Sequence, residues 1–205
     1  MTLADDFSSL GAATLGESGA EPMAPRVRAA WSGARLAAPA FTVQCPADDN
    51  LAIHVGVVTA PAGSALVVQV DAVPERGYWG EVLATAAEAR GLAGLVIDAG
   101  VRDVDALRRH GFPVFSSCIA LRGTHKDAGG VVGTPVRVGD ATVRTGDWVV
   151  GDADGVVVVG SSDIDEVLAA GRMRAEKEEG LFARLRDGAT TIDLLALDAT
   201  RVTGP

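Results

Sequence analysis

An arginine and an aspartate stand side by side at Arg102 and Asp103, shortly after the apolar segment LAGLVID at residues 92–98. Asp103 can supply one oxygen ligand to a hard cation such as Mg²⁺, which needs only one or two protein carboxylates because water and substrate complete its shell. Arg102 can supply a planar charged donor to a developing oxyanion. The pair predicts a metal and oxyanion site or, with equal weight from spacing alone, a helix-initiating aspartate beside an arginine in a surface ion pair.

A cradle for a carboxylate is indicated upstream, where Gly80 precedes the segment EVLATAAEARG. The apolar residues of this segment recur at helical spacing, and its predicted buried face includes Val82 and Leu83. The first-turn amides of Glu81, Val82 and Leu83 would have no acceptor inside the helix, so they are suited to bind an anion. We therefore expect the start of this helix to bind the carboxylate of a small substrate.

Alternating strand and helix patterns must position these residues. Strands rich in Val, Leu and Ile without polar alternation are typical of a parallel sheet that is buried on both faces. In such a sheet, ligands bind beyond the carboxyl ends of the strands, which is where Arg102 and Asp103 lie. The predicted strands are residues 40–45, 64–70, 92–98 and 112–117, and the predicted helices between them are 48–60, 80–91 and 102–111.

The remaining segments have a different sequence pattern, with short Val-rich stretches in place of alternating strands and helices. The Val-rich stretches VVGTPVRV, ATVRT, DWVVGD and GVVVVG are separated by GD and DG turns, which favours short antiparallel strands. A long helix is expected at 163–188, and residues 19–39 have the composition of a surface connection. The sequence therefore predicts one α/β domain at residues 1–160, with a parallel βαβ core and a β-rich second half, followed by a C-terminal helical arm at 161–205.

Composition and charge exclude several classes of protein. The chain of 205 residues has a net charge of −9, which makes nucleic acid and anionic membrane surfaces poor partners. The segment GTHKDAGGVVG does not match a nucleotide-binding loop. Because no targeting or membrane-spanning segment is visible, we expect a cytoplasmic protein.

Other catalytic residue types are poorly placed for chemistry. Cys45 and Cys118 form no paired metal-binding motif, and Cys118 has the surroundings of a small core residue. A Schiff-base mechanism needs a desolvated lysine. Lys177 lies in a charged helical segment, and Lys126 lies in a loop rich in Gly and Asp. Neither lysine is favoured as a nucleophile.

The segment GEVLATAAEARGLAGLVIDAGVRD resembles the RraA-like family, named for the regulator of ribonuclease activity A. The similarity runs from ADDNLAI at 47–53 through GDWVVGDADGVVVV at 146–159 and into the arm. The resemblance implies an α/β sandwich of the swivelling-domain type, assembled as a homotrimer or hexamer with active sites at subunit interfaces. It also implies that the arm at 161–205 packs on a neighbouring subunit.

The family includes class II 4-hydroxy-4-methyl-2-oxoglutarate / 4-carboxy-4-hydroxy-2-oxoadipate aldolases. The resemblance to this branch implies a lyase that depends on Mg²⁺ or Mn²⁺, cleaves 4-hydroxy-2-oxo acids to pyruvate, and decarboxylates oxaloacetate. Both reactions leave the same pyruvate enolate.

The family signature is an Asp, twenty intervening residues and then Arg-Asp, and in this chain Glu81 stands where the first Asp is expected. By resemblance, Asp103 would hold the metal partly through water, Arg102 would stabilise the enolate, and the amides after Gly80 would bind the pyruvyl carboxylate. Glu178, from a neighbouring subunit, would act with Glu81 to orient the water that accepts the substrate's hydroxyl proton. In the charged run AEKEE, Glu178 has the alternative of a solvated helix face.

Two further functions remain open at the level of sequence. The first is a non-catalytic regulator that binds and inhibits a ribonuclease, as some RraA-like proteins do. The chain keeps an acidic residue at Glu81, Asp103 and Glu178, the three positions where the family has one, and this favours the enzyme over the regulator. The second is a methyltransferase, a name attached to some relatives, which no glycine-rich cofactor loop in this chain supports.

Overall fold

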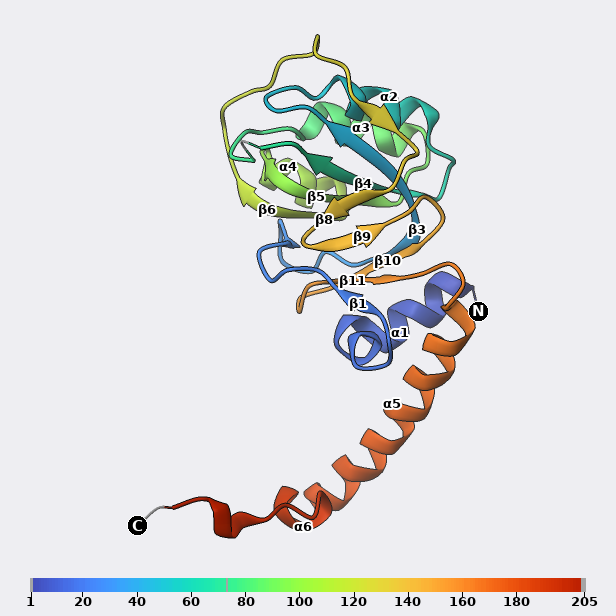
Figure 1. The fold of residues 1–205 in the computed structure, drawn as a ribbon, viewed down its shortest axis with the longest axis vertical. Coiled ribbons are helices and arrows are strands. Elements are labelled where there is room, and N and C mark those ends of the chain that lie inside the picture. Colours follow the sequence, from blue (N-terminus) through green and yellow to red (C-terminus); the bar gives the residue numbers. More distant parts are fainter. Residues whose placement is uncertain (1, 73, 204–205) are drawn as a thin grey trace.

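A computed structural model describes residues 2–72 and 74–203, and it shows a curled α/β sandwich with a helical arm (Figure 1). Four strands form the predicted parallel core in the order β3-β4-β5-β6. Each crossover between them carries a helix, as parallel strands require. The strands are β3 (Leu36–Cys45), β4 (Ala65–Val70), β5 (Gly94–Val101) and β6 (Val114–Ile119), and the helices are α2 (Leu51–Thr59), α3 (Glu81–Ala89) and α4 (Val104–His110).

The Val-rich second half forms antiparallel pairs, which confirms the expectation from its turns. The first half of β3 pairs with β10, and β10 pairs with β11, so the sheet continues beyond the parallel core. A separate hairpin joins β8 to β9. These strands are β7 (Val131–Val132), β8 (Val136–Val138), β9 (Ala141–Val143), β10 (Trp148–Gly151) and β11 (Val156–Val159).

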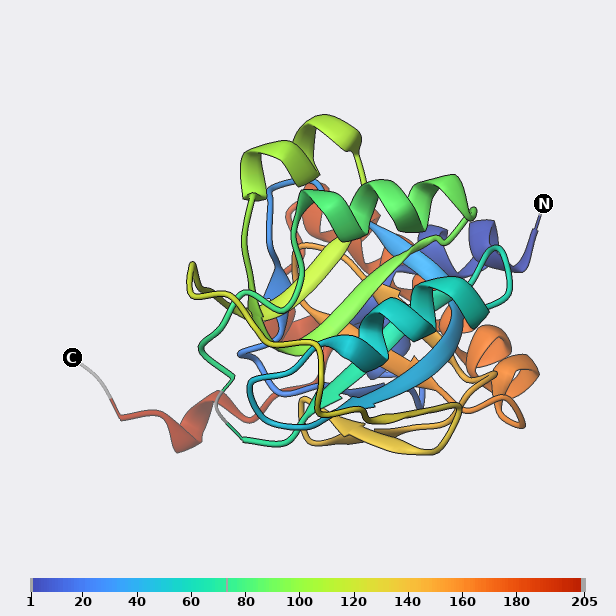
Figure 2. The same ribbon diagram turned by 90° about the horizontal axis from the view of Figure 1, so that it is seen from above.

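The parallel strands are buried on both faces. On β5, Leu95 and Ile97 belong to the apolar cluster that includes residues of α2 and α3, whereas Val96 belongs to the cluster that includes the β8–β9 hairpin. Figure 2 shows these helices and this hairpin on opposite sides of the sheet. Fully burying one such side chain contributes about 1.5–3 kcal/mol. The unbroken apolar runs in the sequence therefore reflect two apolar cores, one on each side of the sheet.

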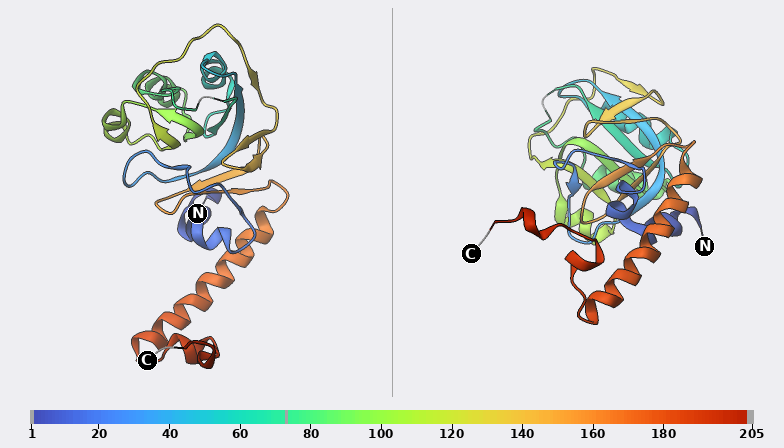
Figure 3. Two further views of the ribbon diagram at one scale, coloured as in Figure 1. Left: turned by 60° about the vertical axis from the view of Figure 1, so that its left-hand side comes forward. Right: turned by 60° about the horizontal axis from the view of Figure 1, so that its bottom comes forward.

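A third apolar cluster joins the two ends of the chain. Helix α1 (Leu3–Gly16) packs Phe7 and Leu15 against Leu168, near the start of helix α5 (Ile164–Arg186). The rest of α5 leaves the body, and α6 (Thr191–Leu194) and the short turn η1 (Ala199–Arg201) follow it (Figures 1 and 3). No residue between 172 and 203 is buried in this single described chain. Beyond Gly171, the arm therefore buries no residue against the rest of the described chain.

Two expectations about these elements are wrong. Residues 19–39 do not simply connect elements at the surface, because Val27, Ala34 and Leu36 are buried and β3 already begins at Leu36. Strands β1 (Glu21–Pro22) and β2 (Arg28–Ala29) extend the sheet at its two edges. Small side chains that pack against a sheet carry little periodic signal, so composition alone suggested a loop.

The predicted apolar face of α3 is also partly wrong. Val82 is 80% exposed, whereas Leu83, Ala84 and Ala87 are buried. The buried face of this short helix therefore consists of Leu83, Ala84 and Ala87, and the Val82 side chain points to the outer surface of the first turn.

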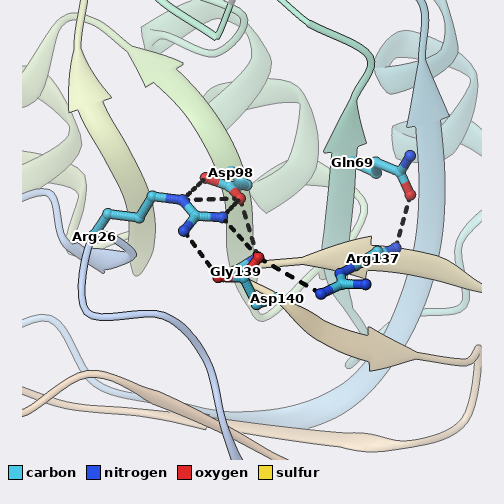
Figure 4. A network of polar contacts seen from close by, with 6 residues as sticks. All are labelled: Arg26, Gln69, Asp98, Arg137, Gly139 and Asp140. Atoms are coloured by element: carbon cyan, nitrogen blue, oxygen red, sulfur yellow. Dashed lines mark hydrogen bonds and ion pairs between the residues drawn. The ribbon is translucent and has the colours of Figure 1, made fainter.

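A polar network fixes the hairpin and the N-terminal segment to the middle of the sheet (Figure 4). Arg26 Nη2 lies 2.7 Å from Asp98 Oδ2 and its Nη1 lies 3.1 Å from Asp140 Oδ2. The backbone N–H of Gly139 also donates to Asp98, at 3.1 Å. Arg26 holds the pKa of the Asp140 carboxyl below its usual value. Asp98 thus anchors the far face of β5, opposite the helices, immediately before the strand reaches Arg102.

None of the helices in the described ranges combines the length and the apolar character that crossing a membrane requires.

Candidate functional site

The site begins where β5 ends and α4 starts. Asp103 adopts a left-handed backbone conformation with φ of 60°, which aspartate tolerates better than most residues. Its Oδ2 accepts a hydrogen bond from the backbone N–H of Glu81 at 3.0 Å. Arg102 Nε lies 3.8 Å from the same Oδ2 atom. The structure therefore brings together the helix start at residue 81 and the Arg102–Asp103 pair, as the sequence predicted.

This geometry changes one detail of the predicted carboxylate cradle. The amide of Glu81 is already bonded to Asp103, so it is not free for a substrate. The amides of Val82 and Leu83 follow it in the first turn, where a helix provides no acceptor. They remain the candidates for binding a substrate carboxylate.

Two glycines allow the close approach of these segments. A Cβ atom on Gly80 would overlap Asp103 Oδ2 and lie 3.1 Å from Arg102 Cγ. A Cβ on Gly77 would lie 2.7 Å from the carbonyl oxygen of Ala120 and 3.0 Å from Arg102 Cδ. Any larger residue at either position would therefore displace the Arg102 stem or the Asp103 carboxylate.

A cavity of about 250 Å³ opens beside the pair. Predicted residues that line it are Gly80, Val82, Leu83, Arg102 and Asp103. The sequence did not assign the other side of the cavity to the site; it is formed by Asn50, His54, Gly77, Tyr78, Trp79, Gly123, Thr124 and Lys126. The cavity thus combines the carboxyl end of β5, the start of α3, helix α2 and the loop that follows β6.

Three buried polar atoms in this wall have no hydrogen-bond partner within the described ranges: Asn50 Oδ1, His54 Nε2 and Trp79 Nε1. An unsatisfied buried polar group costs about 1–3 kcal/mol, so such groups in a cavity indicate a bound ligand or ordered water. Burial and the nearby Lys126 lower the pKa of His54, which favours its neutral form. The wall therefore offers neutral polar atoms together with the cation of Lys126.

A buried carboxylate positions the loop that carries Lys126. Asp49 is 1% exposed, and its Oδ2 accepts hydrogen bonds from Asp127 N at 2.6 Å and Ala128 N at 2.9 Å. Its Oδ1 accepts from Leu51 N at 2.8 Å, at the start of α2. Burial acts to raise the pKa of Asp49, but these backbone N–H groups outweigh it and hold the pKa below its usual value. Asp49 therefore fixes the loop to α2.

The Glu81 side chain takes a different direction from its backbone. Its Oε1 lies 3.4 Å from Nε2 of His110, the last residue of α4, and the residue is absent from the described lining of the cavity. His110 Nδ1 lies 2.8 Å from Glu88 Oε2. The hydrogen bonds to Glu88 and then to Glu81 raise the pKa of His110.

Glu178 is not brought to the cavity within one chain. It lies on α5 and pairs with Arg174, whose Nε is 2.9 Å from Glu178 Oε1. Helix α5 leaves the body on the side of α1, away from α2 and α3 (Figure 1). Glu178 can therefore approach such a cavity only in another copy of the chain.

The donor set of the cavity fits one kind of metal ion. Asp103 is half-exposed at the cavity, and no cluster of three or more His, Cys, Asp or Glu side chains suited to a metal occurs among the described residues. A structural zinc site would need such a cluster. Mg²⁺ takes one or two carboxylates and completes its shell with water and substrate oxygens. Asp103 would hold such an ion.

The fold and the cavity define a mixed α/β protein with a curled sheet and a candidate site at the carboxyl edge of its parallel strands. The family model of the RraA-like proteins, described as Aldolase/RraA, matches residues 2–158, and the chain belongs to this family. A relative from Halalkalibacterium halodurans, provisionally named a 4-hydroxy-4-methyl-2-oxoglutarate aldolase, is 29% identical over 77% of this chain and 75% of its own. A Burkholderia mallei protein with the same provisional name is 34% identical over 60% of this chain and 74% of its own.

Solved structures share the fold. An uncharacterized protein from Pseudomonas syringae pv. tomato has a TM-score of 0.82 and 27% identity, and the match covers 92% of this chain and 90% of that one. Streptomyces coelicolor RraAS2, described as an unusual member of the RNase ES inhibitor RraA protein family, has a TM-score of 0.76 and 26% identity, covering 90% of this chain and 97% of that one.

Proposed function

We propose that this protein is a divalent-metal-dependent aldolase that cleaves 4-hydroxy-2-oxo acids to pyruvate and a second carbonyl compound. The observation that carries the proposal is the cavity in which Arg102, Asp103 and the start of α3 converge. The aldolase names of the relatives in Halalkalibacterium halodurans and Burkholderia mallei support the reaction class. We further propose that the protein decarboxylates oxaloacetate.

The residues divide the work as follows. The amides of Val82 and Leu83 bind the carboxylate next to the keto group, and Arg102 donates to the keto oxygen. When the C3–C4 bond breaks, its electron pair moves toward that oxygen, and the permanently charged guanidinium stabilises the enolate. As a carbonyl forms at C4, the C4 hydroxyl passes its proton to a water molecule that Glu81 and Glu178 of a neighbouring copy orient. Return of a proton from this water to C3 of the enolate then gives pyruvate.

Asp103 is the residue that would hold Mg²⁺ or Mn²⁺, whose chemistry at this place is Lewis-acid polarisation of the keto group. In oxaloacetate the bond that breaks releases CO₂ and leaves the same enolate, so one arrangement of residues serves both reactions. Lys126, across the cavity, adds a positive charge that suits these doubly anionic substrates.

A pyruvate-release assay tests this proposal. We expect pyruvate from oxaloacetate and from 4-hydroxy-4-methyl-2-oxoglutarate with Mg²⁺, and loss of both activities after EDTA treatment. Asp103→Asn keeps a hydrogen-bond acceptor for Glu81 N and a residue type that tolerates φ of 60°, but it removes the charge. We expect this variant to bind Mn²⁺ far more weakly by electron paramagnetic resonance and to lose turnover. Full activity in Asp103→Asn would show that the site is misplaced.

The alternative is a regulator that binds and inhibits a ribonuclease, and the description of Streptomyces coelicolor RraAS2 is the observation that favours it. The same assay separates the two functions. The regulator function replaces the proposed aldolase function if two results are found together. The purified protein would show no metal-dependent release of pyruvate from either substrate, and it would slow RNA cleavage by an RNase E-type enzyme.

A further inference from the structure

We propose that His110 is the positioning residue for the Glu81 carboxylate, and that these two side chains form a matched pair across α3 and α4. The inference rests on the proposed function, because it treats Glu81 as part of the reacting site. His110 Nε2 lies 3.4 Å from Glu81 Oε1, and its Nδ1 lies 2.8 Å from Glu88 Oε2. Both ring nitrogens thus face carboxylates of α3, one at its first residue and one about two turns further along.

Side-chain length makes the pairing specific to glutamate. An aspartate at position 81 would end one carbon–carbon bond earlier, about 1.5 Å short of the present carboxylate. The contact of 3.4 Å is already near the limit of a hydrogen bond, so a shorter side chain would lose His110. The backbone N–H of residue 81 would still reach Asp103, because that bond does not involve the side chain. The extra methylene of Glu81 therefore lets its carboxylate reach the imidazole of His110.

The charges around His110 favour this arrangement. The groups that face it from α3 are Glu88 and Glu81, and within α4 the neighbouring Arg109 is exposed. Only the doubly protonated imidazole donates from both nitrogens, so the two carboxylates favour the imidazolium. The contact with the imidazole in turn restricts the rotamers of Glu81. Glu81 is thereby held as a fixed carboxylate one residue from the cavity lining, at Gly80 and Val82.

A measurement that needs no activity tests the pairing first. NMR titration gives the pKa of His110 in the wild-type protein and in Glu81→Asp, Glu88→Gln and Arg109→Gln. We expect a wild-type pKa above 6.5, a fall of about 0.5 in Glu81→Asp, as for one exposed ion pair, and a larger fall in Glu88→Gln. Arg109→Gln is the control from the same helix and should not lower the pKa. An unchanged pKa in Glu81→Asp would overturn the pairing.

A double-mutant cycle then tests the role in turnover. We expect His110→Gln to lower kcat for pyruvate release about tenfold, as loss of an orienting partner does, with KM within about twofold. The same substitution in the Glu81→Asp background should have no further effect, and Arg109→Gln should match wild type. An equal loss in both backgrounds would overturn the positioning role. If wild type releases no pyruvate, the proposed function fails, and the NMR titration still decides whether the pair exists.

Discussion

Asp103 connects two functions that a sequence pattern cannot separate. Its carboxylate accepts a hydrogen bond from the backbone N–H of Glu81 and also lines the cavity beside Arg102. The alternative of a helix-initiating aspartate is therefore only half of its role, since Asp103 precedes α4 but makes no side-chain cap bond to it. A carboxylate that is held by a neighbouring helix and half-exposed to a cavity is well placed to bind a cation.

At this scale we predict the effect of Gly80→Ala. The added Cβ would overlap Asp103 Oδ2 and contact the Arg102 stem, so both side chains must shift. Because a displacement of about 1 Å in a catalytic group can cost about a hundredfold in rate, we expect kcat/KM for pyruvate release to fall by about that factor. The matched control is Gly16→Ala, where the new Cβ makes only an ordinary contact with Val157. Equal activity of the two variants would contradict this prediction.

At the scale of elements, the cavity depends on how a loop is anchored to a helix. Asp49 holds the loop at Asp127 and Ala128, which places Thr124 and Lys126 over the end of the parallel sheet. This anchoring lies at the start of α2, far in sequence from the strand that carries Arg102. The Arg26–Asp98 network fixes the strand itself, on the face opposite the helices, so the loop and the strand are anchored by different carboxylates.

We predict that Asp49→Asn destabilises the protein by about 2 kcal/mol, because it weakens buried hydrogen bonds to a charged group. It should also raise KM, since Lys126 loses its fixed position. The pKa of Asp49 is depressed in the folded state, so its contribution is present above pH 3.8 and is lost as the pH falls through the folded pKa. In urea denaturation, the difference between wild type and Asp49→Asn should therefore narrow below that pH. Asp165→Asn, an exposed aspartate on α5, is the control and should match wild type at every pH.

At the scale of the whole molecule, the arm consists of helix α5 followed by α6 and η1, and it exposes apolar side chains. Phe182, Ile192, Leu195 and Leu197 are each 44% to 52% exposed in the single chain. Apolar side chains gathered on a projecting element mark a surface for another protein chain. We propose that a neighbouring subunit covers the arm in a homotrimer or hexamer, and that Glu178 reaches a cavity only there.

We expect multi-angle light scattering to give the mass of a trimer or hexamer for the full chain, where the calculated chain mass is 20.9 kDa. Phe182→Asp should shift the protein toward smaller species and reduce pyruvate release, because a charge in a buried contact is costly. Phe182→Leu keeps an apolar side chain and should assemble like wild type. A wild-type chain that is monomeric at micromolar concentration would contradict the proposed assembly.

The order of the core elements was readable from the sequence, because hydrophobic runs and helical spacing are local properties. The strand that delivers Arg102 and Asp103, and the helix that begins at Glu81, were placed from these patterns alone. Residues 19–39 were misread, because alanine-rich packing against a sheet leaves no periodic signal.

Only the tertiary structure decided what surrounds the Arg102–Asp103 pair. Asn50, His54 and Lys126 come from segments distant in sequence, and they meet the pair because parallel strands bring their carboxyl ends to one edge. The direction of the Glu81 side chain was equally undetermined, because it depends on a histidine at the far end of another helix. Sequence thus determined which residues could do the chemistry, whereas packing between elements determined which of them share one cavity.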